Sequence, residues 1–332
     1  MNKKINFGIL GFGLFGEYRL IPGFEKADSA EIISLTKMDG AAARAKAKKY
    51  GIPHGFSYNN LSEFLALEEM DAVFIASPNH VHIHDAISCF EAGKHVLLEK
   101  PMAMNAEECE RIIKSAEKND CKLMIAHCLR YNKTVNYFKT MIDGGKVGEI
   151  VSGTCDFLSE GHKSRRTWKF NKEMAGGGAA FDLGVHVVDT LRYLLDSEVK
   201  DAHCVKFPDP IDDTQVDLVA TFLLNFANGA VGRCLSSFMG KRNLFLEIFG
   251  RKGYIRAYDW NHNFDDIRIE QEIEGDFKRF TIRNDDMYTN EIEDFCAALR
   301  GEQEVGVTGT DGLINQKIID MVNTNQDRIQ ME

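Results

Sequence analysis

The chain has 332 residues, which is more than a single hydrophobic core usually organises, so two domains are expected. Its hydrophobic content of 44%, charged content of 27% and net charge of -10 indicate a globular protein without the clustered basic surface that nucleic acid requires. No apolar run approaches the roughly 18 residues of a membrane span, and the opening MNKKINFGILGFG is expected to form a strand rather than a signal peptide.

The first 125 residues alternate apolar runs with helical patterns. Near-continuous apolar stretches at residues 5–10, 31–35, 72–76, 95–98 and 122–126 are typical of strands that are buried on both faces of a parallel sheet. Capping pairs, Asn60 with Glu63 and Asn105 with Glu108, mark helix starts between them. Residues 1–125 are therefore predicted to form a Rossmann dinucleotide-binding domain with a doubly wound parallel sheet.

Residues 126–332 have a different character. The runs at 216–226 and 230–238 are joined by Asn228-Gly229, a strong hairpin signal, and further strands are expected to 283 with turns at 251–253 and 274–276. Helices are expected near Thr289 and after Thr308, where Thr308 and Asp311 have capping-box spacing. This predicts an α+β domain for substrate binding and oligomerisation, with a large, mainly antiparallel open sheet whose second face meets a partner subunit or water.

The stretch GFGLFG follows the first predicted strand and opens a helix. Gly11 permits the tight turn, Gly13 lets the backbone approach a pyrophosphate, and Gly16 allows close packing of helix and strand. The helix N-terminus supplies N–H groups to the anion. We expect the loop, with Phe12 and Phe15, to lie along a dinucleotide.

Thr36 and Lys37 stand where the second strand should end, a place that usually holds an acidic residue for the adenosine ribose. A lysine there favours a 2′-phosphate, and one charged hydrogen bond of roughly 1.5 to 3 kcal/mol would favour NADP by roughly tenfold to a hundredfold. Asp39 could reach the ribose instead if the strand ends later, which would favour NAD, and Lys37 could also be a solvated loop residue. NADP is the predicted cofactor, with NAD as the alternative.

Three further stretches, SPNHVHIHDA (77–86), AGKHVLLEKPMA (92–103) and AGGGAAFDLGVHVVD (175–189), together with GFGLFG resemble the Gfo/Idh/MocA oxidoreductase family. The resemblance implies a catalytic set of Lys100, Asp182 and His186. It also implies that the cofactor lies along Ser77, Pro78, Asn79, Glu99 and Lys100, with His82 structural or near the cofactor. Lys37 replaces the acidic ribose residue that is usual in the family.

The residue types suit oxidation of a secondary alcohol. A histidine titrates near the working pH and can take the hydroxyl proton while hydride leaves the carbon. Asp182 and His186 are four apart, so on a helix they share a face, and Asp189 continues that face toward a substrate hydroxyl. Lys100, beside a cationic nicotinamide, is expected to act with a lowered pKa or as a hydrogen-bond donor.

Other candidate residues are less specific. Arg130, Arg165 and Trp168 lie where the family contacts substrate and could bind hydroxyls or a sugar face, or hold domains together. His80, His82 and His84 would share one face of a strand and could suggest zinc, but they follow a Pro-Asn turn and begin a helical pattern, so no metal is predicted. Eight cysteines without a CxxC pair are typical of reduced thiols in a cytoplasmic protein.

The sequence thus predicts an NADP-preferring oxidoreductase that transfers hydride between nicotinamide and a secondary alcohol or ketone of a sugar, cyclitol or related polyol. Two alternatives share the fold: an NAD-dependent glycosidase that oxidises its sugar transiently, and a non-catalytic dinucleotide sensor that binds a protein partner. A homodimer or homotetramer through the open sheet is expected.

Overall fold

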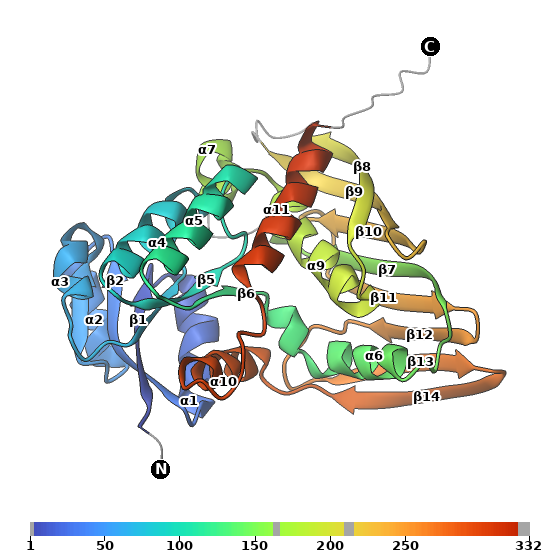
Figure 1. The fold of residues 1–332 in the computed structure, drawn as a ribbon, viewed down its shortest axis with the longest axis horizontal. Coiled ribbons are helices and arrows are strands. Elements are labelled where there is room, and N and C mark those ends of the chain that lie inside the picture. Colours follow the sequence, from blue (N-terminus) through green and yellow to red (C-terminus); the bar gives the residue numbers. More distant parts are fainter. Residues whose placement is uncertain (1–2, 162–166, 209–215, 325–332) are drawn as a thin grey trace. The chain divides into compact units, whose positions relative to one another are not determined.

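The computed structural model describes residues 3–161, 167–208 and 216–324 (Figure 1). The chain divides into an N-terminal unit, Met1–Cys128 with Asp286–Ile314, and a C-terminal unit, Leu129–Asp285 with Asn315–Glu332. The sequence placed the first boundary close by, after residue 125, but assigned 286–314 to the second domain. That segment returns because its helix has an apolar face: the Phe295 ring lies 6.2 Å from the Phe7 ring of the first strand.

The N-terminal unit is built on a parallel sheet of six strands in the order β3-β2-β1-β4-β5-β6. Its strands are β1 (Ile5–Leu10), β2 (Ala30–Lys37), β3 (His54–Ser57), β4 (Ala72–Ile75), β5 (His95–Glu99) and β6 (Leu123–Ala126). This confirms the predicted doubly wound sheet, and the order of the strands reverses direction between β1 and β4.

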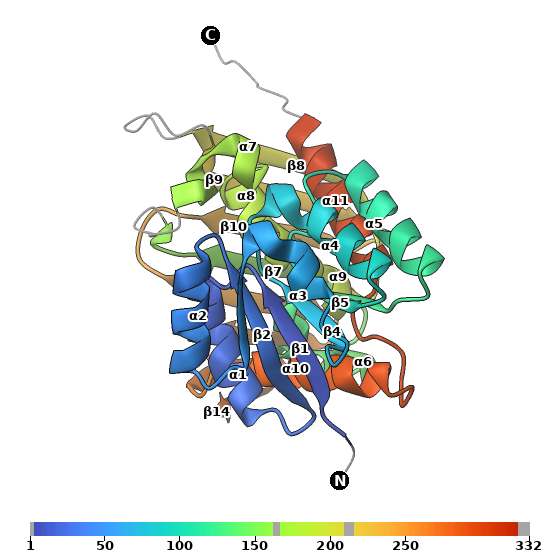
Figure 2. The same cartoon turned by 90° about the vertical axis from the view of Figure 1, so that its left-hand side faces the viewer.

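Helices cover both faces of this sheet. They are α1 (Ile21–Lys26), α2 (Gly40–Lys49), α3 (Leu61–Leu65), α4 (His82–Glu91), α5 (Ala106–Lys118) and α10 (Met287–Leu299). Figure 1 shows α4 and α5 on one face and α1 with α10 on the other, and Figure 2 shows β1, β2 and β4 running between these layers. The strands β1, β4 and β6 are consequently buried along nearly their whole length, whereas the edge strand β3 is only partly buried and was not predicted from the sequence.

The C-terminal unit contains a sheet of eight strands in the order β14-β13-β12-β11-β7-β10-β9-β8, in which only the β7–β10 pair is parallel. The strands are β7 (Ile150–Leu158), β8 (Val199–Pro208), β9 (Asp217–Phe226), β10 (Val231–Ser237), β11 (Asn243–Gly250), β12 (Gly253–Tyr258), β13 (Asp266–Ile273) and β14 (Asp276–Arg283). The predicted hairpin is confirmed: Gly229 has φ +90° and the Ala230 N–H donates to Asn228 Oδ1.

Helices α6 (Lys133–Asp143), α8 (Ala179–Asp182) and α9 (Gly184–Leu195) pack on one face of this sheet. The short α7 (Lys172–Ala175) precedes them, and α11 (Gly309–Thr324) contains the second unit boundary. The predicted capping box opens α11, since the Asp311 N–H donates to Thr308 Oγ1 and the Thr308 N–H to Asp311 Oδ2. None of the helices within the described ranges is long and apolar enough to cross a membrane.

Candidate active site

The predicted cofactor residues of the N-terminal unit gather at the carboxyl ends of its strands. Gly11 to Gly16 follow β1, Lys37 ends β2, Ser77 to Asn79 follow β4, and Glu99 with Lys100 stand at the end of β5. Ligands of doubly wound sheets bind at this edge, at the point where strand order reverses. The structure therefore brings the predicted cofactor residues of four strands to one edge.

Gly11 is required by the fold itself. Its φ is +89°, and a Cβ would lie 2.6 Å from the backbone nitrogen of Ser77. Its N–H donates to Thr36 Oγ1 at 3.0 Å, and the Phe12 N–H donates to the Thr36 carbonyl at 2.8 Å. Thr36 is fully buried, so its side chain holds the glycine loop in place and does not face a ligand.

Gly13 has a different role. It is exposed, and a Cβ there would find no heavy atom nearer than the Gly11 carbonyl oxygen at 3.9 Å. Gly16 packs closely, since a Cβ would lie 2.8 Å from the Phe12 ring. A π-helical turn, Gly16–Leu20, then leads into α1. The space beside Gly13, in front of a helix N-terminus, fits the pyrophosphate of a dinucleotide.

Lys37 lies beside this loop at the end of β2. Its Nζ donates to the Phe12 carbonyl at 2.7 Å, which leaves two of the three ammonium N–H groups for another acceptor. Burial and nearby Lys46 lower the pKa of Lys37, and Glu17 opposes them. Asp39 is the N-cap of α2: its Oδ1 accepts from the N–H groups of Ala41 and Ala42.

Ser77 and His82 belong to a buried polar network that joins two of the predicted loops. The Ser77 hydroxyl donates to Asp85 at 2.6 Å, and Tyr58 donates to the same carboxylate at 2.6 Å. The ring nitrogens of fully buried His82 lie 2.9 Å from the Ser77 carbonyl and 3.0 Å from the Pro101 carbonyl. His82 is thus structural, tying the loop after β4 to the turn after Lys100, and burial lowers its pKa.

Asp85 was not found from the sequence. A charged residue on the buried side of α4 is a weak signal, because its partners Tyr58 and Ser77 come from other elements. His80 and His84 are exposed, while His82 is buried. The three histidines therefore do not share one face.

Lys100 follows Glu99, the last residue of β5, and Glu99 interacts electrostatically with a buried acid that the sequence did not reveal. Glu291 of α10 is 0% exposed, and its carboxyl oxygens have no hydrogen-bond partner among the described residues. Burial, and then Glu99, raise the pKa of Glu291 well above 4.5. Burial, Glu291 and Glu99 raise the pKa of the Cys128 thiol, and Lys100 opposes them.

In the C-terminal unit, Asp182 ends α8 and His186 lies in α9, so the continuous helix expected from their spacing is divided at Leu183. Asp182 Oδ2 accepts from Lys169 Nζ at 2.5 Å. The His186 ring packs against the Phe157 ring of β7, with 5.8 Å between centroids. Lys169, which was not predicted, is therefore a direct partner of a predicted catalytic carboxylate.

The glycine run before Asp182 is explained by close packing on β9. A Cβ at Gly178 would lie 1.8 Å from the Asp217 carbonyl oxygen, and one at Gly184 would lie 2.7 Å from the Phe222 ring. The Asp217 carboxylate accepts from the N–H groups of Gly178 and Ala180 at 3.1 and 2.7 Å. Asp217 positions the start of α8, and nothing local in the sequence identifies it.

The remaining predicted substrate residues have mixed outcomes. Arg130 forms two hydrogen bonds with Asp189, at 3.0 and 2.6 Å, and Asp189, only 1% exposed, also accepts from Asn315. These contacts give Arg130 and Asp189 a structural role, and their contact with substrate stays a prediction. Trp168 is half-buried, in a short helix at Thr167–Phe170, and Arg165 lies outside the described residues.

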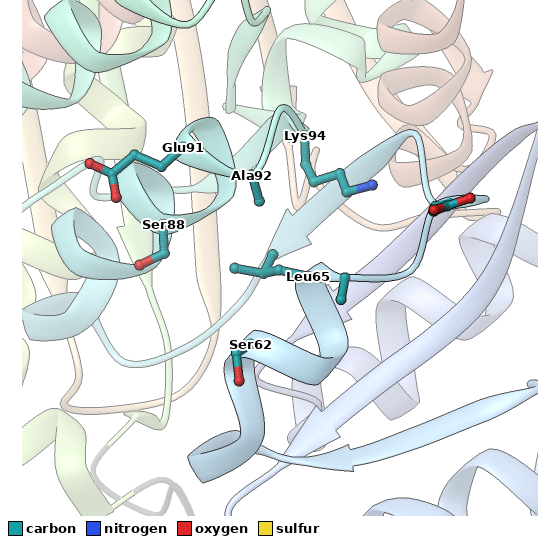
Figure 3. Close-up of a pocket in the computed structure, with 8 residues that line it drawn as sticks. Ser62, Leu65, Ser88, Glu91, Ala92 and Lys94 are labelled. Atoms are coloured by element: carbon teal, nitrogen blue, oxygen red, sulfur yellow. The ribbon is translucent and has the colours of Figure 1, made fainter.

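A groove of about 550 Å³ lies between α3 and α4, away from these residues (Figure 3). Its walls include Ser62, Leu65, Ser88 and Glu91, and it adjoins the segments that lead into β4 and β5, opposite to the glycine loop. The buried Lys94 at its border donates to the carbonyls of the loop before β4. This groove is not where the strand ends would place a dinucleotide.

Comparison with known proteins matches one family model to each of the two parts of the chain that contain the sheets. A family model described as an oxidoreductase family with an NAD-binding Rossmann fold matches residues 5–127, and a GFO/IDH/MocA C-terminal domain model matches residues 135–256. A D-xylose 1-dehydrogenase [NADP(+)] of Haloarcula marismortui is 25% identical over 331 residues, covering 97% of this chain and 91% of that one.

Two other relatives are informative. A levoglucosan dehydrogenase of Pseudarthrobacter phenanthrenivorans is 29% identical over 288 residues, covering 76% of this chain and 73% of that one. The crystal structure of an aldose-aldose oxidoreductase from Caulobacter crescentus, complexed with glycerol, superposes with a TM-score of 0.90 at 23% identity and covers 97% of each chain. At that identity the structural likeness supports the fold alone.

Proposed function

The chain belongs to the GFO/IDH/MocA family of NAD(P)-dependent oxidoreductases, and from that premise we propose that it transfers hydride between a nicotinamide cofactor and a secondary alcohol or ketone of a sugar, cyclitol or related polyol. The observation that carries the proposal is the arrangement at the strand ends of the N-terminal unit. There the glycine loop, the Ser77 loop and Lys100 stand at one edge, beside the space that Gly13 leaves open.

The bound dinucleotide supplies the hydride acceptor or donor. His186 takes the hydroxyl proton during oxidation, because imidazole titrates near neutral pH. Asp182 stabilises the protonated imidazole, and Lys100 donates a hydrogen bond to the reacting oxygen. His82 and Asp85 hold the loops on which the cofactor depends, without a part in proton transfer.

We assign the cofactor preference to Lys37. Its two remaining N–H groups and the positive charge at the end of β2 suit a 2′-phosphate, and Asp39 is occupied in capping α2. Lys37→Asp should change the ratio of NADPH to NADH dissociation constants by roughly tenfold to a hundredfold toward NADH. Lys48→Asp, at an exposed position of α2, is the control and should leave the ratio unchanged. An unchanged ratio in both variants would make Lys37 a surface lysine.

Turnover should be tested with D-xylose, levoglucosan, myo-inositol and a wider aldose and polyol panel, with each cofactor. With the best substrate, His186→Asn should lower kcat by roughly 100- to 10,000-fold while cofactor binding is kept. His84→Asn, at an exposed histidine of α4, is the matched control. Full activity in His186→Asn and Lys100→Met would remove the assigned catalytic roles.

The same panel separates the alternatives. A glycosidase would release the aglycone of an aryl glycoside without net formation of reduced cofactor. A sensor would bind cofactor yet turn over none of the sugars.

We also propose that the chain forms a homodimer or homotetramer through the open face of its eight-stranded sheet. The register of the strands places large exposed apolar side chains from five strands on one face, which are Val205, Phe207, Leu223, Val231, Phe249 and Phe277. Exposed apolar groups gathered in this way are typical of an interface. Sedimentation velocity should show a smaller particle for Leu223→Glu than for the wild type, and no change for Ala45→Glu on α2. An unchanged particle in both variants would exclude this face.

A cytoplasmic location is proposed as well. All eight cysteines are free, and seven of them are buried.

A further inference from the structure

Asp182 forms an ion pair with Lys169, a residue that has no role in the reaction proposed above. Lys169 Nζ lies 2.5 Å from Asp182 Oδ2, and the side chains are only 11% and 14% exposed. Lys169 belongs to the short helix Thr167–Phe170, thirteen residues before Asp182. The ion pair is thus largely removed from water and joins two separate segments of the C-terminal unit.

Both partners are anchored by the packing around them. The Phe170 ring packs edge-on against the Phe238 ring, with 6.0 Å between centroids, in a cluster with Ala179 and Leu183 on either side of Asp182. The Asp217 carboxylate holds the N-terminus of α8. The backbone on each side of the ion pair is therefore fixed, which limits where the carboxylate can point.

Such a pair is costly to form as a stabilising device. Removing two charges from water costs several kcal/mol per ion, and apolar residues often stabilise a site equally well. A lysine that neutralises a carboxylate at this depth does favour the ionised form of the acid strongly. The Lys169–Asp182 ion pair therefore acts on the charge state and the orientation of the Asp182 carboxylate rather than on the stability of the fold.

We propose that Lys169 is a positioning residue that keeps Asp182 ionised and fixes the direction of its carboxylate for the proton transfer at His186. The inference rests on the proposed function, because it gives Lys169 its effect through Asp182. Lys169 does not itself exchange a proton with substrate. An arginine can replace it in part, whereas a neutral side chain cannot.

The charge state can be measured without any substrate. In protein labelled with [4-¹³C]aspartate, the carboxyl resonance that is missing from Asp182→Asn identifies Asp182. In Lys169→Met this resonance should titrate about one pH unit or more above its wild-type midpoint. Lys169→Arg should stay close to the wild type. Lys172→Met, at an exposed lysine of α7, is the control and should leave the midpoint unchanged.

Kinetics then test the positioning role. Lys169→Met should lower kcat about tenfold or more, with the dissociation constant of NADPH unchanged. The acid limb of its kcat–pH profile should move to higher pH, as the Asp182 resonance does. If Lys169 acts through Asp182, the double variant Lys169→Met/Asp182→Asn should have the kcat of Asp182→Asn alone. The double variant also removes both charges, so it remains informative if Lys169→Met folds poorly.

An Asp182 midpoint that does not move in Lys169→Met, or kcat losses that multiply in the double variant, would overturn the inference while leaving the proposed oxidoreductase intact. Absence of turnover in the wild type would instead contradict the proposed function, and the titration would still decide the charge state of Asp182.

Discussion

The substitution Gly13→Ala separates the folding role of the glycine loop from its binding role. The added Cβ has 3.9 Å to its nearest heavy atom, so the free energy of unfolding should change by less than about 1 kcal/mol. The same methyl group fills the space assigned to the pyrophosphate, where forced overpacking costs about 1 to 3 kcal/mol. The dissociation constant of the reduced cofactor should therefore rise roughly 5- to 150-fold.

NADPH fluorescence titration and urea unfolding measure the two quantities on the same protein. Gly11→Ala is the contrasting variant, because its Cβ would lie 2.6 Å from the Ser77 backbone at a φ of +89°. It should lose both stability and cofactor affinity. A stably folded Gly13→Ala that binds both cofactors as tightly as the wild type would refute the placement of the pyrophosphate.

Three further predictions concern residues around the site. Thr36→Val leaves the Gly11 N–H without its acceptor and should cost about 1 to 3 kcal/mol of unfolding free energy, whereas Thr36→Ser should cost less. Gly178→Ala should cost about 3 kcal/mol or more in urea unfolding, because its Cβ would lie 1.8 Å from the Asp217 carbonyl oxygen. Hydrogen bonds, chiefly from two lysines, lower the pKa of Glu17 from its ordinary value of 4.5 to about 2. The ionised carboxylate therefore stabilises the fold fully at pH values above 4.5. Glu17→Gln should therefore unfold at lower urea than the wild type at pH 7, and this gap should close as the pH falls from 4.5 toward 2.

Each of these predictions has a result that contradicts it. Equal losses in Thr36→Val and Thr36→Ser would mean that packing, and not the hydroxyl, holds the loop. A Gly178→Ala protein with wild-type stability would show that α8 can move away from β9. A gap for Glu17→Gln that stays constant across the acid range would mean that its charge does not contribute.

The N-terminal sheet could be predicted because its information is local. Five of its six strands contain a short apolar run, and the glycine motif indicates the turn that follows β1. The edge strand β3 has no such run, is only partly buried and was not predicted. The hairpins at Asn228-Gly229, at 251–253 and at 274–276 could also be predicted, because their turn residues are local signals. Strands β7 and β8 were not predicted. The sequence of β7 alternates only weakly, and this strand pairs in parallel with the distant β10.

The candidate site could likewise be predicted only where its residues belong to local motifs. The family motifs marked Lys100, Asp182 and His186, but their supporting partners could not be found in the same way. Asp85 lies beside Ser77 because α4 folds back on the strand end, and Asp217 reaches Gly178 from a different strand. Glu291 approaches Glu99 only because α10 returns to the first sheet.

By itself the sequence determined the doubly wound sheet, the glycine loop, the lysine at the end of β2 and the motif residues, since each depends on neighbours within a few positions. Only the tertiary structure decided that Thr36 anchors the loop, that Asp39 is occupied as a helix cap and that Lys169 holds Asp182. The reason is physical: hydrogen bonds and ion pairs form between side chains that burial brings together, and burial depends on long-range packing rather than on sequence spacing.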